Sequence, residues 1–297
     1  MKPLRYIIVL ATLACTSASG AESGGSKDPA PLFRSNDVLE VTISAPIKQI
    51  MRDRPDSEDT QGTLTYEDPE AGETTLDIGI RTRGRFRRQK DICPFAPLRL
   101  NFRKTKGTLF AKSNKLKLVT HCRSGSNIYT QIILKEYLAY RILNNLTEAS
   151  FKVRLLRVTY VDNSNGKVFD TNYAFLIEHR DQLAKRIGRE VSSAENTTVS
   201  ALDGAETNIS SVFQYLVGNT DFSPIKGVPG ERCCHNYVLL KSGEDKMLSV
   251  PYDFDVTGIV DAPYAVPNPR FHLRNVEQRL YRGPVSYTHL TLPTMLA

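Results

Sequence analysis

The chain has 297 residues, a formal net charge of +7 at pH 7, and 40% hydrophobic residues. Basic residues interleaved with aromatic residues do not extend along the whole chain, which argues against a nucleic-acid-binding protein. The modest positive charge suits an anionic ligand or an acidic envelope surface. No segment beyond the N-terminus has the ~18 apolar residues that a membrane-spanning helix needs, so we expect no transmembrane segment.

The N-terminus has the pattern of an export signal. Lys2 and Arg5 precede an apolar stretch from Tyr6 to Ala14, and small residues follow up to Gly20. We expect residues 1–20 to be a signal peptide and the mature protein to be exported, periplasmic or extracellular. A lipoprotein attached through Cys15 is the less favoured alternative. Residues 1–20 carry two basic residues and no acidic one, so their removal lowers the net charge to +5 and leaves about 277 residues, enough for one large domain or two lobes.

Four cysteines remain after the signal. In an oxidising compartment an even number predicts disulfides. A bond between Cys93 and Cys122, which we expect on neighbouring strands, would be worth ~3 kcal/mol, although the sequence does not fix the connectivity. Cys233 and Cys234, together with His121 and His235, leave a zinc site as an alternative. Zinc ligands normally come as spaced pairs, so this alternative is less favoured.

The first half of the mature chain is predicted to be mostly strands. Residues 21–35 are rich in Gly, Ser and Pro and indicate a flexible lead-in, while Met51 to Glu73 is acidic and typical of a loop. Alternation of apolar and polar residues predicts a half-buried strand, and apolar residues at helical spacing predict a helix. On this basis we expect strands at 38–43, 74–86, 98–102 and 115–119, followed by a helix at 128–143.

The second half mixes strands with helices. Residues 285–297 change composition abruptly, so we expect them to be a non-native tail and the native C-terminus to be missing. The pattern before them predicts a strand pair at 153–161 and 171–177, a short helix at 182–187, a helix that ends at Val217, strands at 237–240 and 247–250, and a surface extension at 261–282.

The sequence Glu178-His179-Arg180-Asp181 contains the H-R-D triplet of kinase catalytic loops. The asparagine that should follow the aspartate by five positions is replaced by Arg186, and the triplet directly follows a strand rather than a long helix. We therefore expect Asp181 to start a helix rather than to act in catalysis.

The segment from Val212 to Gly258 carries the residues best suited to chemistry. Asp221 follows the end of a helix, Asn236 precedes a pair of strands, and Asp253 and Asp255 follow the second strand. A kinase-type site needs one carboxylate to orient the attacking hydroxyl, and an amide oxygen and a carboxylate to hold Mg²⁺ against nucleotide phosphates. The alternative is that these residues are turn caps and solvated strand ends.

The same segment resembles the CotH family, secreted or spore-coat proteins related to atypical protein kinases. The resemblance rests on N-T-D at 219–221, H-N-Y-V-L-L at 235–240 and V-P-Y-D-F-D at 250–255, and it extends less specifically over roughly residues 44–260. Two positions depart from the family pattern: His235 replaces an asparagine and Tyr252 replaces a tryptophan. Neither departure removes an expected oxygen ligand.

The resemblance implies an α+β, two-lobed protein-kinase-like fold. Its N-lobe, at about 36–178, would be an antiparallel sheet, and its C-lobe, at about 179–284, would be mainly helical and truncated. The implied activity is transfer of the γ-phosphoryl group of ATP to a Ser or Thr hydroxyl of a protein, with Mg²⁺ or Mn²⁺. The alternative is a non-catalytic envelope or surface binding module on a degenerate kinase-like scaffold. Substrate identity and oligomeric state are not indicated.

The resemblance also assigns roles to individual residues. Asp221 would orient the acceptor hydroxyl, Asn236 and Asp253 would hold the metal, and Asp255 would be a second metal ligand or a structural acid. The nucleotide contacts would be Lys117 paired with Glu136, with Lys115 or Arg99 as substitutes for the lysine, Arg83 and Gly84 at the phosphates, and Glu178 at a hinge near the adenine.

Overall fold

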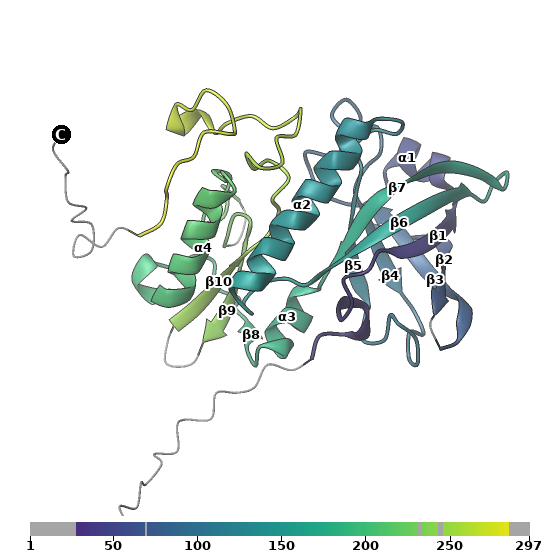
Figure 1. Ribbon diagram of the computed structural model, residues 1–297, viewed down its shortest axis with the longest axis horizontal. Helices are drawn as coiled ribbons and strands as arrows, with labels where there is room; N and C mark the ends of the chain where they lie inside the picture. Colours follow the sequence, from purple (N-terminus) through teal and green to yellow (C-terminus); the bar gives the residue numbers. More distant parts are fainter. Residues whose placement is uncertain (1–27, 69, 231–232, 243–245, 285–297) are drawn as a thin grey trace, which may run out of the picture.

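The computed structural model describes residues 28–68, 70–230, 233–242 and 246–284 (Figure 1). The expected signal peptide at 1–20 and the expected non-native tail at 285–297 lie outside the described residues. Among the helices that are described, none combines the length and the apolar character needed to cross a membrane.

Seven strands of the first half close into a barrel. Around the barrel their order is β1-β2-β3-β4-β5-β7-β6. Neighbouring strands are antiparallel except at the closure, where Leu39–Ala45 runs parallel to Leu156–Asp162. The strands are β1 (Leu39–Ala45), β2 (Thr60–Asp68), β3 (Gly72–Thr82), β4 (Leu98–Phe102), β5 (Lys115–Thr120), β6 (Val153–Asp162) and β7 (Lys167–Ile177).

Alternating side chains fill the barrel and cover its outside. In β4, Leu98, Leu100 and Phe102 are buried while the residues between them are partly exposed, so every second side chain points into the barrel. The interior is one continuous hydrophobic core, to which the 3₁₀ helix η1 (Pro31–Phe33) contributes Leu32 and Phe33. The lead-in expected to extend to residue 35 therefore packs against the barrel from this short helix onward.

A smaller sheet and two helices form the second half (Figure 1). The sheet has three strands in the order β10 (Lys246–Pro251), β9 (Tyr237–Ser242) and β8 (Glu190–Val191). A second hydrophobic core joins this sheet to the outside of the barrel and to helix α2 (Asn127–Leu146), which lies between them.

The other described helices belong to one half each. Helix α1 (Ile47–Asp53) belongs to the barrel half, and α3 (Arg180–Arg186) and α4 (Gly204–Leu216) belong to the second half, with the short 3₁₀ helices η2 (Val199–Ala201) and η3 (Pro269–Phe271).

The expected two-lobed kinase-like fold is wrong. The described residues are mostly β, the first half is a closed barrel rather than an open antiparallel sheet, and the second half is built on a sheet rather than mainly on helices. The error begins at Met51 to Glu73, which was expected to be a loop but contains the end of α1 and all of β2. Leu64 and Tyr66 are the only hydrophobic residues of β2 in the barrel core, so its sequence pattern is weak.

Two disulfides join the cysteines of the described residues. Cys93 is bonded to Cys122, the pairing that the sequence favoured, although both residues lie in loops beside the barrel rather than within strands. Cys233 is bonded to its neighbour Cys234. Because all of these thiols are used, none remains for the zinc alternative.

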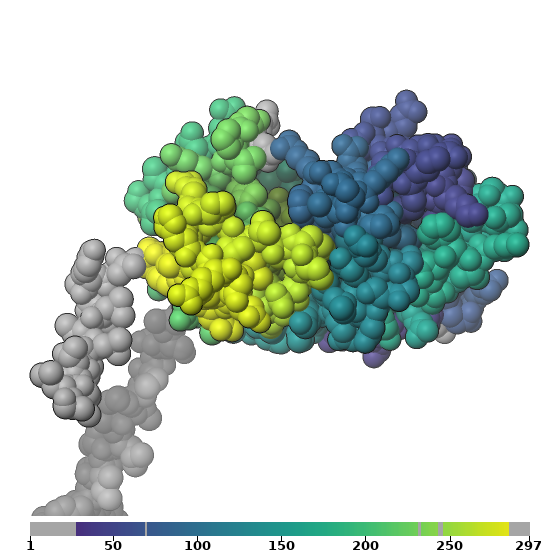
Figure 2. Space-filling view, turned by 90° about the horizontal axis from the view of Figure 1, so that it is seen from above, coloured from purple at the N-terminus to yellow at the C-terminus, as the bar shows by residue number. Residues whose placement is uncertain are grey.

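The C-terminal extension, residues 261–284, lies on the surface of the molecule (Figure 2, yellow). It runs from the loop after β3, where Tyr264 lies 6.0 Å from Phe86, to α4, where Tyr281 lies 6.2 Å from Tyr215. Near the middle it passes so close to Gly258 that a Cβ atom there would lie 2.5 Å from the carbonyl oxygen of Val276. Only glycine fits at that position.

Candidate functional site

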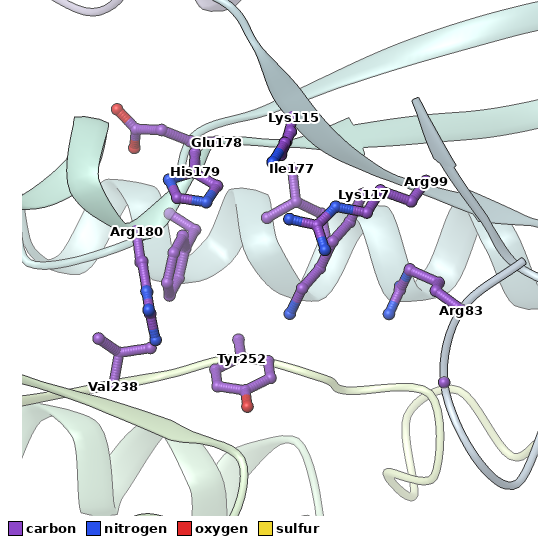
Figure 3. Close-up of a pocket in the computed structure, with 12 residues that line it drawn as sticks. Arg83, Arg99, Lys115, Lys117, Ile177, Glu178, His179, Arg180, Val238 and Tyr252 are labelled. Carbon is purple, nitrogen blue, oxygen red and sulfur yellow. The ribbon is translucent and has the colours of Figure 1, made fainter. Parts of the chain in front are cut away.

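A pocket of about 500 Å³ opens where the barrel meets the smaller sheet. Figure 3 shows Arg83, Lys117 and Arg180 around a common space, with Tyr252 on the opposite side. Phe151, His179 and Tyr252 add flat ring surfaces to the lining. The pocket cations are Arg83, Arg99, Lys115, Lys117 and Arg180.

The strands explain why so many cations meet here. Arg99 on β4 pairs directly with Lys117 on β5, and Lys115 is two residues before Lys117, so all three belong to the outward-facing side of neighbouring strands. Arg83 follows the end of β3, and the next residue, Gly84, has a left-handed φ of 79° that favours glycine. The sequence prediction of a basic phosphate contact at Arg83 and Gly84 therefore falls on the lining of this pocket.

Glu178 does not offset the positive charge of the pocket. Its two carboxylate oxygens each accept a hydrogen bond of 3.0 Å from Arg186, and one also accepts the backbone N–H of Lys152. Glu178, which was expected at a hinge near the adenine, lines the pocket, but its carboxylate is already paired. The pocket therefore carries a strong net positive potential suited to a polyanion.

Lys117 is the pocket cation most affected by its surroundings. Although its side chain reaches solvent, the pocket walls and the charge of Arg83 lower the pKa of Lys117 to about 8. Its Nζ atom lies 4.4 Å from the centre of the Tyr252 ring, a cation–π contact. The pairing with Glu136 expected from the sequence is replaced by a different one, since Glu136 forms an ion pair with Arg87 at 3.8 Å.

Asp221 and Asn236 lie together, as a shared site would require. The Asn236 amide donates to the backbone oxygen of Asp221 at 2.7 Å and to its carboxylate at 3.1 Å. His235 Nε2 lies 2.8 Å from the other carboxylate oxygen. The Asp221 backbone N–H donates to Asn219, so both ends of the residue are fixed. The Asp221 side chain remains 44% exposed, which leaves it open to a ligand.

Asp253 joins this group through the backbone of the residues that directly follow β10. The N–H of Tyr252 donates to the backbone oxygen of Asn236 at 3.0 Å, and the N–H of Asp253 donates to Tyr140 Oη at 2.9 Å. Asn236 and Asp253 both have left-handed backbones, with φ of 56° and 67°. Such conformations are uncommon outside glycine and cluster at functional sites. Asn236 and Asp253, which flank the paired ends of β9 and β10, are therefore candidate site residues.

Asp255 and Glu136 form a buried acidic pair around Arg87. Arg87 Nη1 lies 3.7 Å from Asp255 and 3.8 Å from Glu136, and Tyr264 donates a hydrogen bond of 3.1 Å to Asp255. Burial and the neighbouring Asp255 raise the pKa of Glu136 well above its ordinary value. Burial and the charge of Asp253, opposed by Arg87, raise the pKa of Asp255 to about 6. Arg87, to which the sequence assigned no role, therefore forms ion pairs with both carboxyl groups.

The pocket and the acidic group are neighbours. The charge of Asp253 acts both on Lys117 in the pocket and on Asp255, and the charge of Asp221 also reaches Asp255. Asp221, Asn236, Asp253 and Asp255 do not themselves line the pocket. Asp253 directly follows the lining residue Tyr252, whose N–H is bonded to Asn236, so the acidic group adjoins one edge of the pocket through Tyr252. The basic run after β3 could have drawn attention to Arg87. Its partners could not be predicted, because Glu136 on α2 and Asp255 after β10 are far from Arg87 in the sequence.

The oxygen-rich donors at this edge suit a hard divalent cation. The carboxylate of Asp253 accepts no hydrogen bond from the described residues, and the amide of Asn236 donates through nitrogen, which leaves its oxygen for a ligand. In the part of the chain that the structure describes, no three His, Cys, Asp or Glu side chains are grouped so as to hold a metal on their own. A metal here would therefore need Asn236 and oxygens of the substrate.

Comparison with known proteins assigns no family. No family model matches the chain, and no curated protein matches it. The function must be inferred from the geometry of the pocket and its acidic edge.

Proposed function

We propose that the protein transfers the γ-phosphoryl group of ATP to a Ser or Thr hydroxyl of a protein outside the cytoplasm. The observation that carries this proposal is the cationic pocket together with Asp221, Asn236 and Asp253, which adjoin it through the lining residue Tyr252. The resemblance of this segment to the CotH family supports the same activity. The proposal does not depend on a kinase fold, because function lies in the site rather than in the scaffold.

The pocket supplies what a nucleoside triphosphate needs. Arginine forks bind phosphate oxygens in pairs, and Arg83 and Arg99 lie with Lys117 on one side of the pocket. The rings of Phe151 and Tyr252 offer faces against which a purine base can stack. The pocket volume of about 500 Å³ lies within the range of small-molecule sites.

Asp221 is the residue that orients the acceptor. In the reaction the acceptor oxygen forms a bond to the γ-phosphorus as the bond from phosphorus to the bridging oxygen breaks. The hydroxyl proton passes to Asp221 and ADP leaves. Asn236 and His235 hold the Asp221 carboxylate in a fixed position, so its contribution is placement as well as proton acceptance.

Asn236 and Asp253 would hold a Mg²⁺ or Mn²⁺ ion. When bound, such an ion supplies positive charge to the phosphate oxygens. Of the two roles open to Asp255, the structural one fits better, because Asp255 is buried and bound by Arg87 and Tyr264. The disulfide between Cys93 and Cys122 is consistent with the proposed location in an oxidising compartment.

The test is transfer of label from γ-labelled ATP to a generic protein acceptor with Mg²⁺ or Mn²⁺. Asp221→Asn and Asp253→Asn should each lower the rate by about 10³-fold or more, because each removes charge placed for the transition state. Asp77→Asn, an exposed acid on β3, is the matched control and should keep the wild-type rate. Labelling that persists in both site variants would show that the site is misassigned.

A non-catalytic binding module is the second candidate. It is favoured by one observation: both carboxylate oxygens of Asp221 are already engaged, by His235 and Asn236. On this alternative the wild-type protein would show neither transfer of label nor a nucleotide-dependent rise in melting temperature. A rise in melting temperature with ATP and Mg²⁺ would contradict it.

A further inference from the structure

Arg282 of the C-terminal extension holds the loop that carries Asp221. Its Nη1 atom donates hydrogen bonds of 2.8 Å to the backbone oxygens of Thr220 and Phe222, the two residues that flank Asp221. Its guanidinium also lies 4.5 Å from the ring centres of Phe222 and Phe271. A residue some sixty positions away in the sequence therefore places a positive charge beside the proposed acceptor-orienting carboxylate.

Two more cations belong to the same neighbourhood. Arg270 directly precedes Phe271 in η3, the ring on which Arg282 lies. Burial lowers the pKa of Arg282, and the charges of Arg270 and Asp221 both act on it. The backbone N–H of His235 donates a hydrogen bond of 3.0 Å to the backbone oxygen of Lys226, and the imidazole of His235 contacts Asp221, so Lys226 lies on a segment paired with a neighbour of Asp221.

These charges have no function in the ATP pocket. Lys226, Arg270 and Arg282 are not among the residues that line it. Within the described ranges, none of the three forms an ion pair with a carboxylate. Lys226 and Arg270 are also exposed. Cations that form no ion pair, next to a catalytic carboxylate, attract negative charge on an approaching protein segment.

We infer that Lys226, Arg270 and Arg282 form the acceptor-binding surface, and that this surface selects protein segments in which Asp or Glu residues flank the acceptor hydroxyl. The inference rests on the proposed phosphotransfer and adds the class of acceptor. Arg282 has two roles, because it attracts acidic residues of the acceptor and also fixes the Asp221 loop through its hydrogen bonds. Lys226 and Arg270 contribute only their positive charge.

The experiment compares three peptides of equal length in which one Ser is flanked by Glu, Gln or Lys residues. With the mature protein at saturating ATP and Mg²⁺, KM should be lowest for the Glu peptide and about tenfold higher for the Lys peptide. The double variant Lys226→Glu/Arg270→Glu should reverse this order and leave KM for ATP unchanged. The control Lys106→Glu/Lys167→Glu makes the same change in net charge at exposed positions of the barrel half and should keep the order.

Three results would overturn the inference: equal KM for the three peptides, reversal of the order by the control variant, or an equal rise in KM for ATP in the site variant. If no peptide is labelled, the proposed phosphotransfer fails, and the surface is then judged by binding of fluorescent peptides alone. A preference for the Glu peptide that Lys226→Glu/Arg270→Glu reverses would still support the surface. Equal binding of the three peptides would contradict the inferred acceptor-binding surface.

Discussion

At the residue scale, Arg87 connects three segments that are far apart in the sequence. It lies in the loop after β3 and forms ion pairs with Glu136 on α2 and with Asp255 after β10. It also donates to the backbone oxygen of Thr120, at the end of β5. A buried cation of this kind stabilises mainly because its partners would otherwise be buried without compensation.

Replacement of Arg87 by Met should therefore destabilise the protein by about 3–5 kcal/mol at pH 8, and Arg87→Lys should cost less. The loss should be smaller at pH 5. The folded-state pKa of Glu136 is raised, so Glu136 favours the folded state below its unfolded value near 4.5, and that contribution is lost as pH rises. Urea unfolding of wild type and both variants at pH 5 and pH 8 measures the loss of unfolding free energy at each pH. A loss that is equal at both pH values would contradict the stated role of Glu136.

At the scale of elements, the two disulfides differ in the length of chain that they close. Cys93 and Cys122 are 29 residues apart, and their bond ties the long loop after β3 to the end of β5. Cys233 and Cys234 are adjacent, so their bond closes almost no chain. The entropy that a disulfide removes from the unfolded chain grows with this separation.

The double variant Cys93→Ala/Cys122→Ala should accordingly lose about 3–4 kcal/mol of unfolding free energy. Cys233→Ser/Cys234→Ser, the matched control, should lose much less. Chemical denaturation of the two variants under the same buffer gives the comparison, and a larger loss in the control would show that loop closure is not what the first bond contributes.

At the scale of the whole molecule, the barrel and the smaller sheet share a hydrophobic core. Phe254, in the turn after β10, is fully buried and lies 4.6 Å from the ring of Tyr140 on α2 and 5.2 Å from that of Phe213 on α4. The same core includes Phe175 on the outside of the barrel. The two halves are therefore expected to unfold together.

Phe254→Ala should cost about 3–5 kcal/mol and should leave a single unfolding transition at lower denaturant concentration. Far-UV circular dichroism and tyrosine fluorescence, which sample the whole chain and the shared core, should give the same midpoint. Two separate transitions would show that the barrel is stable without the smaller sheet.

Much of the strand pattern could be predicted from local sequence, because alternation reports which side chains face a core. The expected strands at 98–102 and 115–119 correspond to β4 and β5 nearly residue for residue, and the expected helix at 128–143 lies within α2. Barrel closure could not be predicted in this way. It depends on the parallel pairing of β1 with β6, which are more than a hundred residues apart and have no local signal for each other.

The site was predictable to a similar extent. Asp221 and Asn236 were singled out by their chemistry and their order, and the structure places them in contact. Lys117 was correctly placed on a strand, but its expected partner Glu136 pairs with Arg87, because side-chain partners depend on the tertiary arrangement of segments. Glu178 lines the pocket, yet its carboxylate is bound to Arg186, eight residues further along the chain.

Helix α2 holds two parts of the site from one side. Glu136 and Tyr140 lie one turn apart, so they share a face of the helix. Glu136 contacts Arg87, and Tyr140 accepts the backbone N–H of Asp253. A translation of α2 along its own axis would therefore disturb the Glu136–Arg87 ion pair and the Asp253–Tyr140 hydrogen bond together. The spacing of one helical turn therefore fixes the position of the turn at Asp253 relative to the buried ion pairs of Arg87.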